Sequence, residues 1–259
     1  IRSEYTDAIR KINNAIKLLR ENGLLGDNIL DSGYNLQISL RKGPGAFVCG
    51  EETALIASLE GKRGMPSSKP PYPASSGYLG RPTVVNNVET LSNLPGIIRK
   101  GPAWFKEIGV EGCTGTKIFS ISGRVRMSGL VEVPMGTTFD TIVNDIIGGV
   151  HKGRELKALH VGGPAGCMVP AEMMHVPVTY ESLKSKELVM GSGGIVVMDD
   201  KTCVVNTVKY FMDYVDKQSC GKCIPCREGT RRMAEILGSI TRKPADEEGH
   251  TTLDRFKGV

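Results

Sequence analysis

The sequence has no apolar run long enough to cross a bilayer, which takes about 18 or more residues, so no direct membrane span is expected. It also has no stretch like a secretion signal at its beginning, where IRSEYTDAIRKINNAIKLLREN is predicted to form an amphipathic helix. The apolar face of that helix is expected to hold Ala8, Ile12, Ile16 and Leu19. We therefore predict a cytoplasmic protein.

Other patterns are missing as well. The Lys and Arg residues are dispersed rather than clustered with aromatic residues, and the net charge is only +5, which argues against nucleic-acid binding. The four histidines form no close-spaced metal pair, and no G-x-S-x-G signature of a serine nucleophile occurs. Seven cysteines, an odd number without an export signal, argue against a disulfide framework and for a reducing compartment.

The chain of 259 residues can form one large domain or several smaller ones, and it shows three stretches of different texture. Alternating helix, strand, turn and helix predict an α/β layer at 1–109. Short β-branched runs around a single helix predict a small α+β domain at 110–199, and helical spacing predicts a helical region at 200–259. Since the first residue is Ile1 and not methionine, we expect a piece of a longer chain.

In the first stretch, the opening helix is predicted to stop at Asn22-Gly23, a good C-cap pair. LQISLRKG, residues 36–43, alternates apolar and polar side chains and is predicted to be a strand. A glycine-bearing turn then leads into a helix that is expected to end near Gly61. The Pro-, Gly- and Ser-rich residues 67–82 are expected to form a long loop, and long loops are usually functional or disordered.

Further along, helical pieces are expected to break at Pro95 and Pro102. TKIFSISGRV, GLVEVPMGTTF and KALHVGGP are predicted strands, and TFDTIVNDII between them is a predicted helix. GSGG is expected to be a turn before a strand at Ile195–Met198. CVVNTVKYFMDYVDKQ and REGTRRMAEILGSI are predicted helices, and the polar residues 245–259 could start another.

A C-x2-C-x2-C motif in the last stretch is formed by Cys220, Cys223 and Cys226. This spacing is typical of [4Fe–4S] sites, whereas structural zinc usually takes paired C-x2-C arms, so we predict an iron–sulfur cluster. Zinc with His250 as fourth ligand, and three reduced cysteines without a metal, are the alternatives. Pro225 favours a loop within the motif, and a helix is expected to begin at Arg227, where its amides suit an anionic cluster.

Two further motifs offer polar groups to a ligand. GPGAFVCGEETAL spaces its glycines as G-x-G-x4-G and places Glu51 and Glu52 at a helix start. These carboxylates complement the helix dipole, or they accept hydrogen bonds from ribose hydroxyls or a carboxamide. NNVET at 86–90 could contact the edge of a polar ring system, but from the residues alone we prefer an N-cap at Asn86 with Glu89 as its capping-box partner.

These motifs occur in one order over nearly the whole chain, as GPGAFVCGEETALIASLEGKRGMP, KPPYPA, PTVVNNVETLSNLP, MGSGGIVVMDD and SCGKCIPCREGT. Together they resemble the flavin-bearing, NADH-oxidising subunit of respiratory complex I. The same family includes the diaphorase subunits of NAD-linked formate dehydrogenases and of NAD(P)-linked hydrogenases, among them electron-bifurcating ones. The resemblance implies a Rossmann-like FMN domain, then a small β-grasp domain, then a helical bundle with a [4Fe–4S] cluster.

The resemblance further implies an NAD(P)H:acceptor oxidoreductase subunit, in which a hydride moves between NAD(P)H and FMN and single electrons leave through the cluster. Expected partners are a small [2Fe–2S] subunit and a larger iron–sulfur, hydrogenase or formate dehydrogenase subunit. A complex I subunit and a hydrogenase or formate dehydrogenase diaphorase subunit both fit, as do NADH and NADPH. A scaffold module without catalysis is a rival hypothesis, against which the intact Glu51, Asn86 and cysteine motif argue.

Carried over position by position, the resemblance assigns the cluster to the cysteine motif. It places FMN contacts at Asn86, Asn87 and Thr90, and it places Lys69 and Tyr72 of the long loop beside the dinucleotide. The flavin and nicotinamide site would be lined by Phe47, Gly50, Glu51 and Glu52.

Among these residues, Glu51 is expected to act in catalysis by positioning the dinucleotide and weakening the binding of product. Phe47 stands where the family usually has Tyr, so a hydrogen bond from a phenol is lost. The resemblance also implies two parts outside this sequence. A glycine-rich FMN-phosphate loop is expected upstream of Ile1, and a fourth cysteine ligand of the cluster is expected just past Val259.

Overall fold

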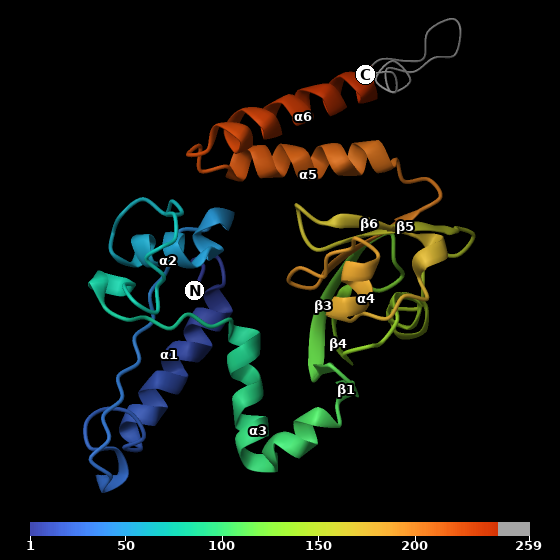
Figure 1. Cartoon of the computed structure of the whole chain (residues 1–259). Helices are drawn as coiled ribbons and strands as arrows, with labels where there is room; N and C mark the ends of the chain where they lie inside the picture. Colours follow the sequence, from blue (N-terminus) through green and yellow to red (C-terminus); the bar gives the residue numbers. More distant parts are fainter. Residues whose placement is uncertain (243–259) are drawn as a thin grey trace, which may run out of the picture. The chain divides into compact units, whose positions relative to one another are not determined.

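The computed structural model describes residues 1–242 and divides into two compact units, each taken by itself below (Figure 1). The first unit holds Ile1–Val85 together with the short segment Gln218–Lys222. The second unit holds Asn86–Lys217 and, among the described residues, 223–242. The helix start proposed for residues 245–259, and with it His250, lies outside the described residues.

The first unit opens with helix α1 (Thr6–Glu21), as the sequence predicts. Its buried side chains are Ile9 and Ile16, so the predicted apolar face was right at Ile16. It was wrong at Ala8 and Ile12, which are exposed. Ile9 and Ile16 are two helical turns apart and lie on the buried line of the helix, whereas Ile12 and Ala8 lie progressively to one side of that line, toward water.

Both longer helices of this unit end as predicted. Asn22 is the C-cap of α1, and Gly23 follows with φ of 66°. Helix α2 (Glu52–Leu59) has Glu60 as its C-cap, and Gly61 follows with φ of 76°. A glycine adopts this left-handed backbone without a Cβ clash and thereby ends each helix.

The strand predicted at residues 36–43 is wrong for the described chain. This segment forms only isolated bridges, one between Leu36 and Gly26 and one between Gly43 and Arg2. An alternating pattern becomes a strand only where a neighbouring strand pairs with it along its length, because the ladder hydrogen bonds hold the extended backbone. The remaining short elements of the unit are the 3-10 turns η1 (Ile29–Asp31), η2 (Phe47–Gly50) and η3 (Tyr78–Gly80).

The second unit begins with helix α3 (Val88–Lys106). Its backbone breaks at Gly101, with φ of 86°, directly before Pro102, so that predicted break is confirmed. The break predicted at Pro95 is wrong, because the helix continues through it. A proline inside a helix removes one hydrogen bond and bends the axis, but it does not have to end the helix.

A five-stranded sheet in the order β4-β3-β7-β5-β6 forms the middle of this unit (Figure 1). Its β3–β7 pair is parallel, and its other pairs are antiparallel. The strands are β3 (Thr116–Gly123), β4 (Gly129–Pro134), β5 (Leu156–Val161), β6 (Cys167–Pro170) and β7 (Gly194–Asp199). Four were predicted, and β6 was missed. The smaller elements are β1 (Gly109–Val110), β2 (Cys113–Thr114), the π-helical η4 (Thr141–Ile146), the 3-10 turn η5 (Ala171–Met173) and α4 (Tyr180–Ser185).

One contiguous core lies under the sheet. Alternate residues of β3, Phe119 and Ile121, point into it and are 0% and 2% exposed. Ile142 and Val143 of η4, where the sequence predicts a helix, cover the same core and are fully buried. The alternate residues of β3 are thus buried on one face of the sheet, and a helical segment covers that face. This arrangement is expected for a mixed α and β region.

Two long helices follow the sheet, α5 (Val204–Gln218) and α6 (Ile224–Arg242), and they lie side by side (Figure 1). The predicted start of the second helix at Arg227 is wrong, because α6 already begins at Ile224 and takes Pro225 into its first turn. Proline is tolerated there because the first amides of a helix have no partner within it. Within residues 1–242, no helix is both long enough and apolar enough to cross a membrane.

Candidate functional site

The start of α2 carries the acidic pair. Glu51 is the N-cap of the helix, and its Oε2 accepts hydrogen bonds from the backbone N–H groups of Thr53 at 2.9 Å and Ala54 at 3.0 Å. The hydroxyl of Thr53 donates to the same oxygen. Glu52 is the first residue of the helix. Glu51 thus serves the start of the helix, as the dipole interpretation expects, and it does so as the N-cap, which was not predicted from the sequence. The other carboxylate oxygen, Oε1, lies near a different residue.

That neighbour is Lys69 of the long loop. Its Nζ lies 3.7 Å from Glu51 Oε1 and donates a hydrogen bond to Glu52. The hydrogen bond with Glu52 raises the pKa of Lys69 above its ordinary value, so the ammonium stays charged. Partial burial raises the pKa of Glu51, but the bonds from Thr53 and Ala54 and the charge of Lys69 outweigh it and leave the pKa lowered. The three side chains form a charged cluster at roughly one-third exposure.

The long loop is tied to α2 at two more points. The backbone N–H of Ser67 donates to Thr53 Oγ1 at 2.9 Å, and the N–H of Leu79 donates to Glu60 Oε1 at 2.8 Å. These bonds join the loop to both ends of the helix. The long loop predicted from composition is therefore attached to α2 by hydrogen bonds. Lys69 contacts the two carboxylates from this attached loop.

Two aromatic residues close to the cluster in the sequence have exposed side chains. Phe47 and Tyr72 are 52% and 59% exposed. A Cβ added at Gly50 would meet no atom within 4 Å, and φ there is not positive, so neither packing nor backbone conformation in this structure requires glycine. Exposed rings, a bare backbone and carboxylates at a helix start suit a flat, polar ring system that approaches closely. The residues present thus fit a flavin.

The predicted FMN contacts Asn86, Asn87 and Thr90 belong to the second unit and are exposed at the start of α3. The N-cap is Asn87, whose Oδ1 accepts from the N–H of Glu89 at 2.7 Å, so the N-cap predicted at Asn86 is displaced by one residue. Because the side chain of Asn87 satisfies an orphan amide of the helix, this position has a structural function of its own.

Glu89 holds the start of α3 to strand β3. Its carboxylate pairs with the ammonium of Lys117, a buried residue, and accepts the N–H of Ile118 at 3.0 Å. Burial raises the pKa of Glu89, but the hydrogen bonds from Lys117 and Ile118 outweigh it, and the pKa is lowered. The asparagine pair is thereby positioned on a helix end that is anchored to the sheet.

All three cysteines of the motif are thiols, and none of them forms a disulfide. Cys220 belongs to the first unit and is half-buried, whereas Cys223 and Cys226 belong to the second and are exposed. Cys226 lies in the first turn of α6, and Cys223 immediately precedes that helix. Within the described residues, no group of three or more His, Cys, Asp or Glu side chains is arranged to hold a metal. By donor chemistry, three thiols of this spacing fit an iron–sulfur cluster.

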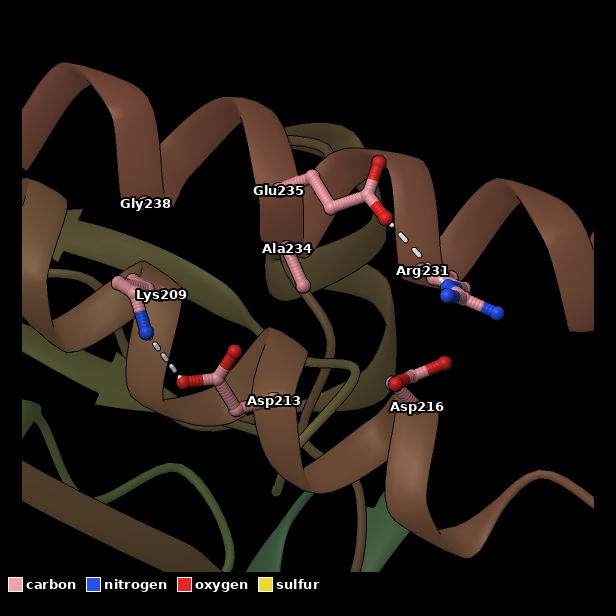
Figure 2. Close-up of a pocket in the computed structure, with 7 residues that line it drawn as sticks. All are labelled: Lys209, Asp213, Asp216, Arg231, Ala234, Glu235 and Gly238. Carbon is pink, nitrogen blue, oxygen red and sulfur yellow. Dashed lines mark hydrogen bonds and ion pairs between the residues drawn. The ribbon is translucent and has the colours of Figure 1, made fainter.

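A groove of about 410 Å³ runs between α5 and α6 (Figure 2). In Figure 2, Lys209 and Asp213 of α5 form an ion pair at 2.5 Å, and Arg231 and Glu235 of α6 form another at 3.4 Å. Asp216 also lines the groove. None of the predicted site residues lines this groove.

Sequence reasoning missed the residues that hold the site in shape. Thr53, Ser67 and Glu60 position the acidic pair and the long loop. A carboxylate or hydroxyl within two residues of a helix start is a capping signal and could have pointed to Thr53. Ser67 and Glu60 had no such signal, because their bonds depend on how the loop folds back.

Two family models match this chain. One, described as the Nuo51 FMN-binding domain, covers residues 1–96. The other, described as the NADH-ubiquinone oxidoreductase-F iron-sulfur binding region, covers residues 206–258. The acidic cluster lies within the first match and the cysteine motif within the second. The class is thus a flavin-binding chain with an iron–sulfur region.

Relatives narrow the class further. The chain is 48% identical over 259 residues to the NADP-reducing hydrogenase subunit HndC of Solidesulfovibrio fructosivorans, covering 100% of this chain and 52% of that relative. It is 44% identical over 240 residues to an NADH-quinone oxidoreductase subunit of Rhizobium meliloti, covering 93% and 57%. The chain belongs to this family of NADH-quinone oxidoreductase and hydrogenase subunits, and it spans little more than half the length of these relatives.

Solved structures give the same answer. The chain aligns with a crystal structure of an NAD⁺-reducing [NiFe]-hydrogenase in the H2-reduced state with a TM-score of 0.81 and 34% identity, covering 100% of this chain and 42% of that one. The air-oxidized state of an NAD⁺-reducing [NiFe]-hydrogenase aligns with a TM-score of 0.78 and 35% identity, covering 95% and 40%. The predicted family is confirmed, and so are FMN and a [4Fe–4S] cluster as its cofactors.

Proposed function

We propose that this chain forms part of an NAD(P)H:acceptor oxidoreductase subunit. The observation that carries the proposal is the cluster of Glu51, Glu52 and Lys69 beside the bare backbone of Gly50, within a stretch that matches an FMN-binding domain. The chemistry supplied by bound FMN and the cluster is hydride transfer with the nicotinamide, followed by transfer of single electrons. The residues of the chain supply placement and charge.

Three groups of residues have separate roles in this proposal. The exposed rings of Phe47 and Tyr72 offer stacking surfaces to the planar rings. Glu52 and Glu51 Oε1 accept hydrogen bonds from the dinucleotide, and Lys69 balances their charge so that a polyanionic ligand can approach. Asn86, Asn87 and Thr90 contribute polar contacts to FMN from the start of α3.

The cysteine motif supplies the soft ligands. Thiolates of Cys220, Cys223 and Cys226 would hold the [4Fe–4S] cluster. The positive end of the helix dipole at the start of α6, where Cys226 lies, favours the negative charge of such a ligand set. The spacing of the three cysteines favours an iron–sulfur cluster over zinc.

The finer architecture belongs to the same proposal. We assign residues 1–109 to a Rossmann-like FMN and dinucleotide domain, 110–199 to a β-grasp domain, and 200–259 to a helical iron–sulfur domain. The partners would be a small [2Fe–2S] subunit and a larger iron–sulfur subunit at the cytoplasmic side. The mixed five-stranded sheet between β1 and α5 supports the middle assignment.

A diaphorase subunit of a hydrogenase is the second candidate. It is favoured by the 48% identity to a hydrogenase subunit and by the alignment with the NAD⁺-reducing [NiFe]-hydrogenase. A respiratory subunit is favoured by the 44% identity to the NADH-quinone oxidoreductase relative. Both candidates use the same chemistry at this site, so purification of the full chain with its native partners separates them.

The decisive experiment replaces Glu51 with glutamine in the flavin-loaded full-length subunit. Glu51→Gln keeps an amide oxygen that can cap α2 but removes the negative charge, so the fold should be retained. We expect the KM for NADH to rise by about tenfold and product release to change. The exposed Glu21→Gln on α1 is the matched control. Unchanged NADH affinity and product release would remove Glu51 from the proposed site.

A further inference from the structure

A short segment from far along the chain belongs to the unit that carries the acidic cluster. Residues Gln218–Lys222, at the end of α5 and beyond, group with Ile1–Val85. Gln218 Oε1 accepts the backbone N–H of Phe47 at 2.9 Å, across 171 positions. Lys222 Nζ donates to the carbonyl of Pro66 at 2.6 Å, across 156 positions.

Gln218 and Lys222 lie on either side of Cys220 in the sequence. Their hydrogen bonds reach two different segments of the proposed site, the η2 turn and the start of the long loop, which are called its two walls below. Phe47 opens the η2 turn, which leads through Gly50 to Glu51. Pro66 directly precedes the long loop that carries Lys69. Ser67, the next residue, is itself bonded to Thr53 of α2.

The hydrogen bond between Gln218 and Phe47 caps the start of the η2 turn. The N-cap of η2 is Ala46, which has no side chain able to accept a hydrogen bond, and the turn buries none of its residues. The first amides of a helical turn have no partner inside it. Gln218 therefore caps η2 from a distant part of the chain.

We propose that Gln218 and Lys222 are positioning residues that clamp the η2 turn and the long loop to the segment bearing Cys220. This proposal rests on the proposed function, because it gives the cysteine segment a second task besides ligation. The same five residues that supply one cluster thiolate also hold both walls of the flavin and dinucleotide site. A change in that segment is therefore transmitted to the loops through two hydrogen bonds.

Hydrogen–deuterium exchange tests the clamp without relying on turnover. In the full-length subunit, Gln218→Leu removes the acceptor at similar size, and Gln218→Glu keeps an acceptor oxygen. We expect peptides that include the amide of Phe47 to exchange about fivefold faster in Gln218→Leu than in the wild type, with Gln218→Glu close to the wild type. Lys217→Met, at the exposed neighbouring position of α5, should leave exchange unchanged.

Lys222→Met tests the second bond in the same way. We expect faster exchange in peptides around Ser67 and a KM for NAD(P)H raised by about fivefold, with iron and sulfide content per chain unchanged. If Gln218→Leu fails to fold, Lys222→Met decides the question. Unchanged exchange at Phe47 or Ser67 in the folded variants would overturn the clamp. Altered exchange in a protein that never oxidises NAD(P)H would uphold the clamp and refute the proposed function.

Discussion

Side chains in the sheet region, residues 109–199, and in the site region, residues 1–85, are held in different ways. In the sheet region, Phe119, Phe139 and Leu159 are fully buried in one continuous core. In the site region, the buried aliphatic side chains are few: Ile9, Ile16, Leu25, Ala54 and Ile56. The large rings proposed to meet ligands there are exposed.

Polar contacts take the place of a core in the site region. Glu51 caps α2, Thr53 and Glu60 hold the long loop, and Gln218 caps the η2 turn. A hydrogen bond contributes roughly 0.5–1.5 kcal/mol, less than the burial of one large side chain. Segments held in this way open locally at low cost, which suits loops that must admit and release a dinucleotide. The sheet region, by contrast, should unfold as one body.

The largest expected effect tests the core of the sheet region. Phe119→Ala removes a fully buried ring from β3 and should lower the free energy of unfolding by about 3–5 kcal/mol. Ile118→Ala, one residue away on the opposite face and 41% exposed, should cost under about 1 kcal/mol. Urea denaturation followed by circular dichroism measures both. Equal costs for the two variants would mean that this core does not stabilise the region.

A smaller effect is expected where a polar contact meets the sheet. Glu89→Ala leaves the ammonium of Lys117 buried without its carboxylate, which should cost about 2 kcal/mol of unfolding free energy. The cost stays below that of a fully buried pair because the Glu89 side chain is 32% exposed.

A double-mutant cycle separates this charge effect from lost packing. Adding Lys117→Met to Glu89→Ala removes the unpaired charge and should recover much of the stability, as measured by urea denaturation. If the double variant is as unstable as the sum of the two single variants, the pair contributes no interaction and α3 is held to β3 by other contacts.

Local signals in the sequence predicted much of this structure. The alternating strands, the glycines after α1 and α2, and the acidic helix start at Glu51 each depend on neighbours within a few residues. The motif order predicted the family. The resemblance placed Lys69 beside the dinucleotide, but its contacts with Glu51 and Glu52 were not predicted, because 17 positions separate Lys69 from Glu52.

The features that were predicted wrongly or missed all depend on contacts with other segments of the chain. Residues 36–43 alternate correctly, but in the described chain they meet no strand along their length. Ile12 has helix spacing with Ile16, yet which stripe of α1 is buried depends on what packs there. The cap that Gln218 provides for Phe47 spans 171 positions and has no pattern in the sequence. Tertiary contacts decide such features, and periodicity does not encode them.

The smallest expected effect concerns a titratable group inside the sheet region. His160 of β5 is 4% exposed and stacks on Phe211 of α5, with ring centroids 3.9 Å apart. Burial lowers the pKa of His160 below the ordinary value of 6.5. The unfolded chain therefore takes up a proton as the pH falls through 6.5, while the folded chain still resists it. The stability that neutral His160 contributes is present above that pH and is lost below it.

His160→Phe keeps a ring against Phe211 but removes the proton-binding site. Between about pH 8 and about pH 5.5, the wild type should lose more unfolding free energy than this variant, by up to about 1 kcal/mol. His151→Gln, at an exposed position, is the control and should follow the wild type. If the wild type and His160→Phe lose stability in parallel as the pH falls, proton uptake at His160 does not differ between the folded and unfolded chain. The buried core of the sheet region would then tolerate a charged side chain, contrary to what its packing indicates. The difference between this core and the polar contacts of the site region would accordingly be smaller than the burial of His160 implies.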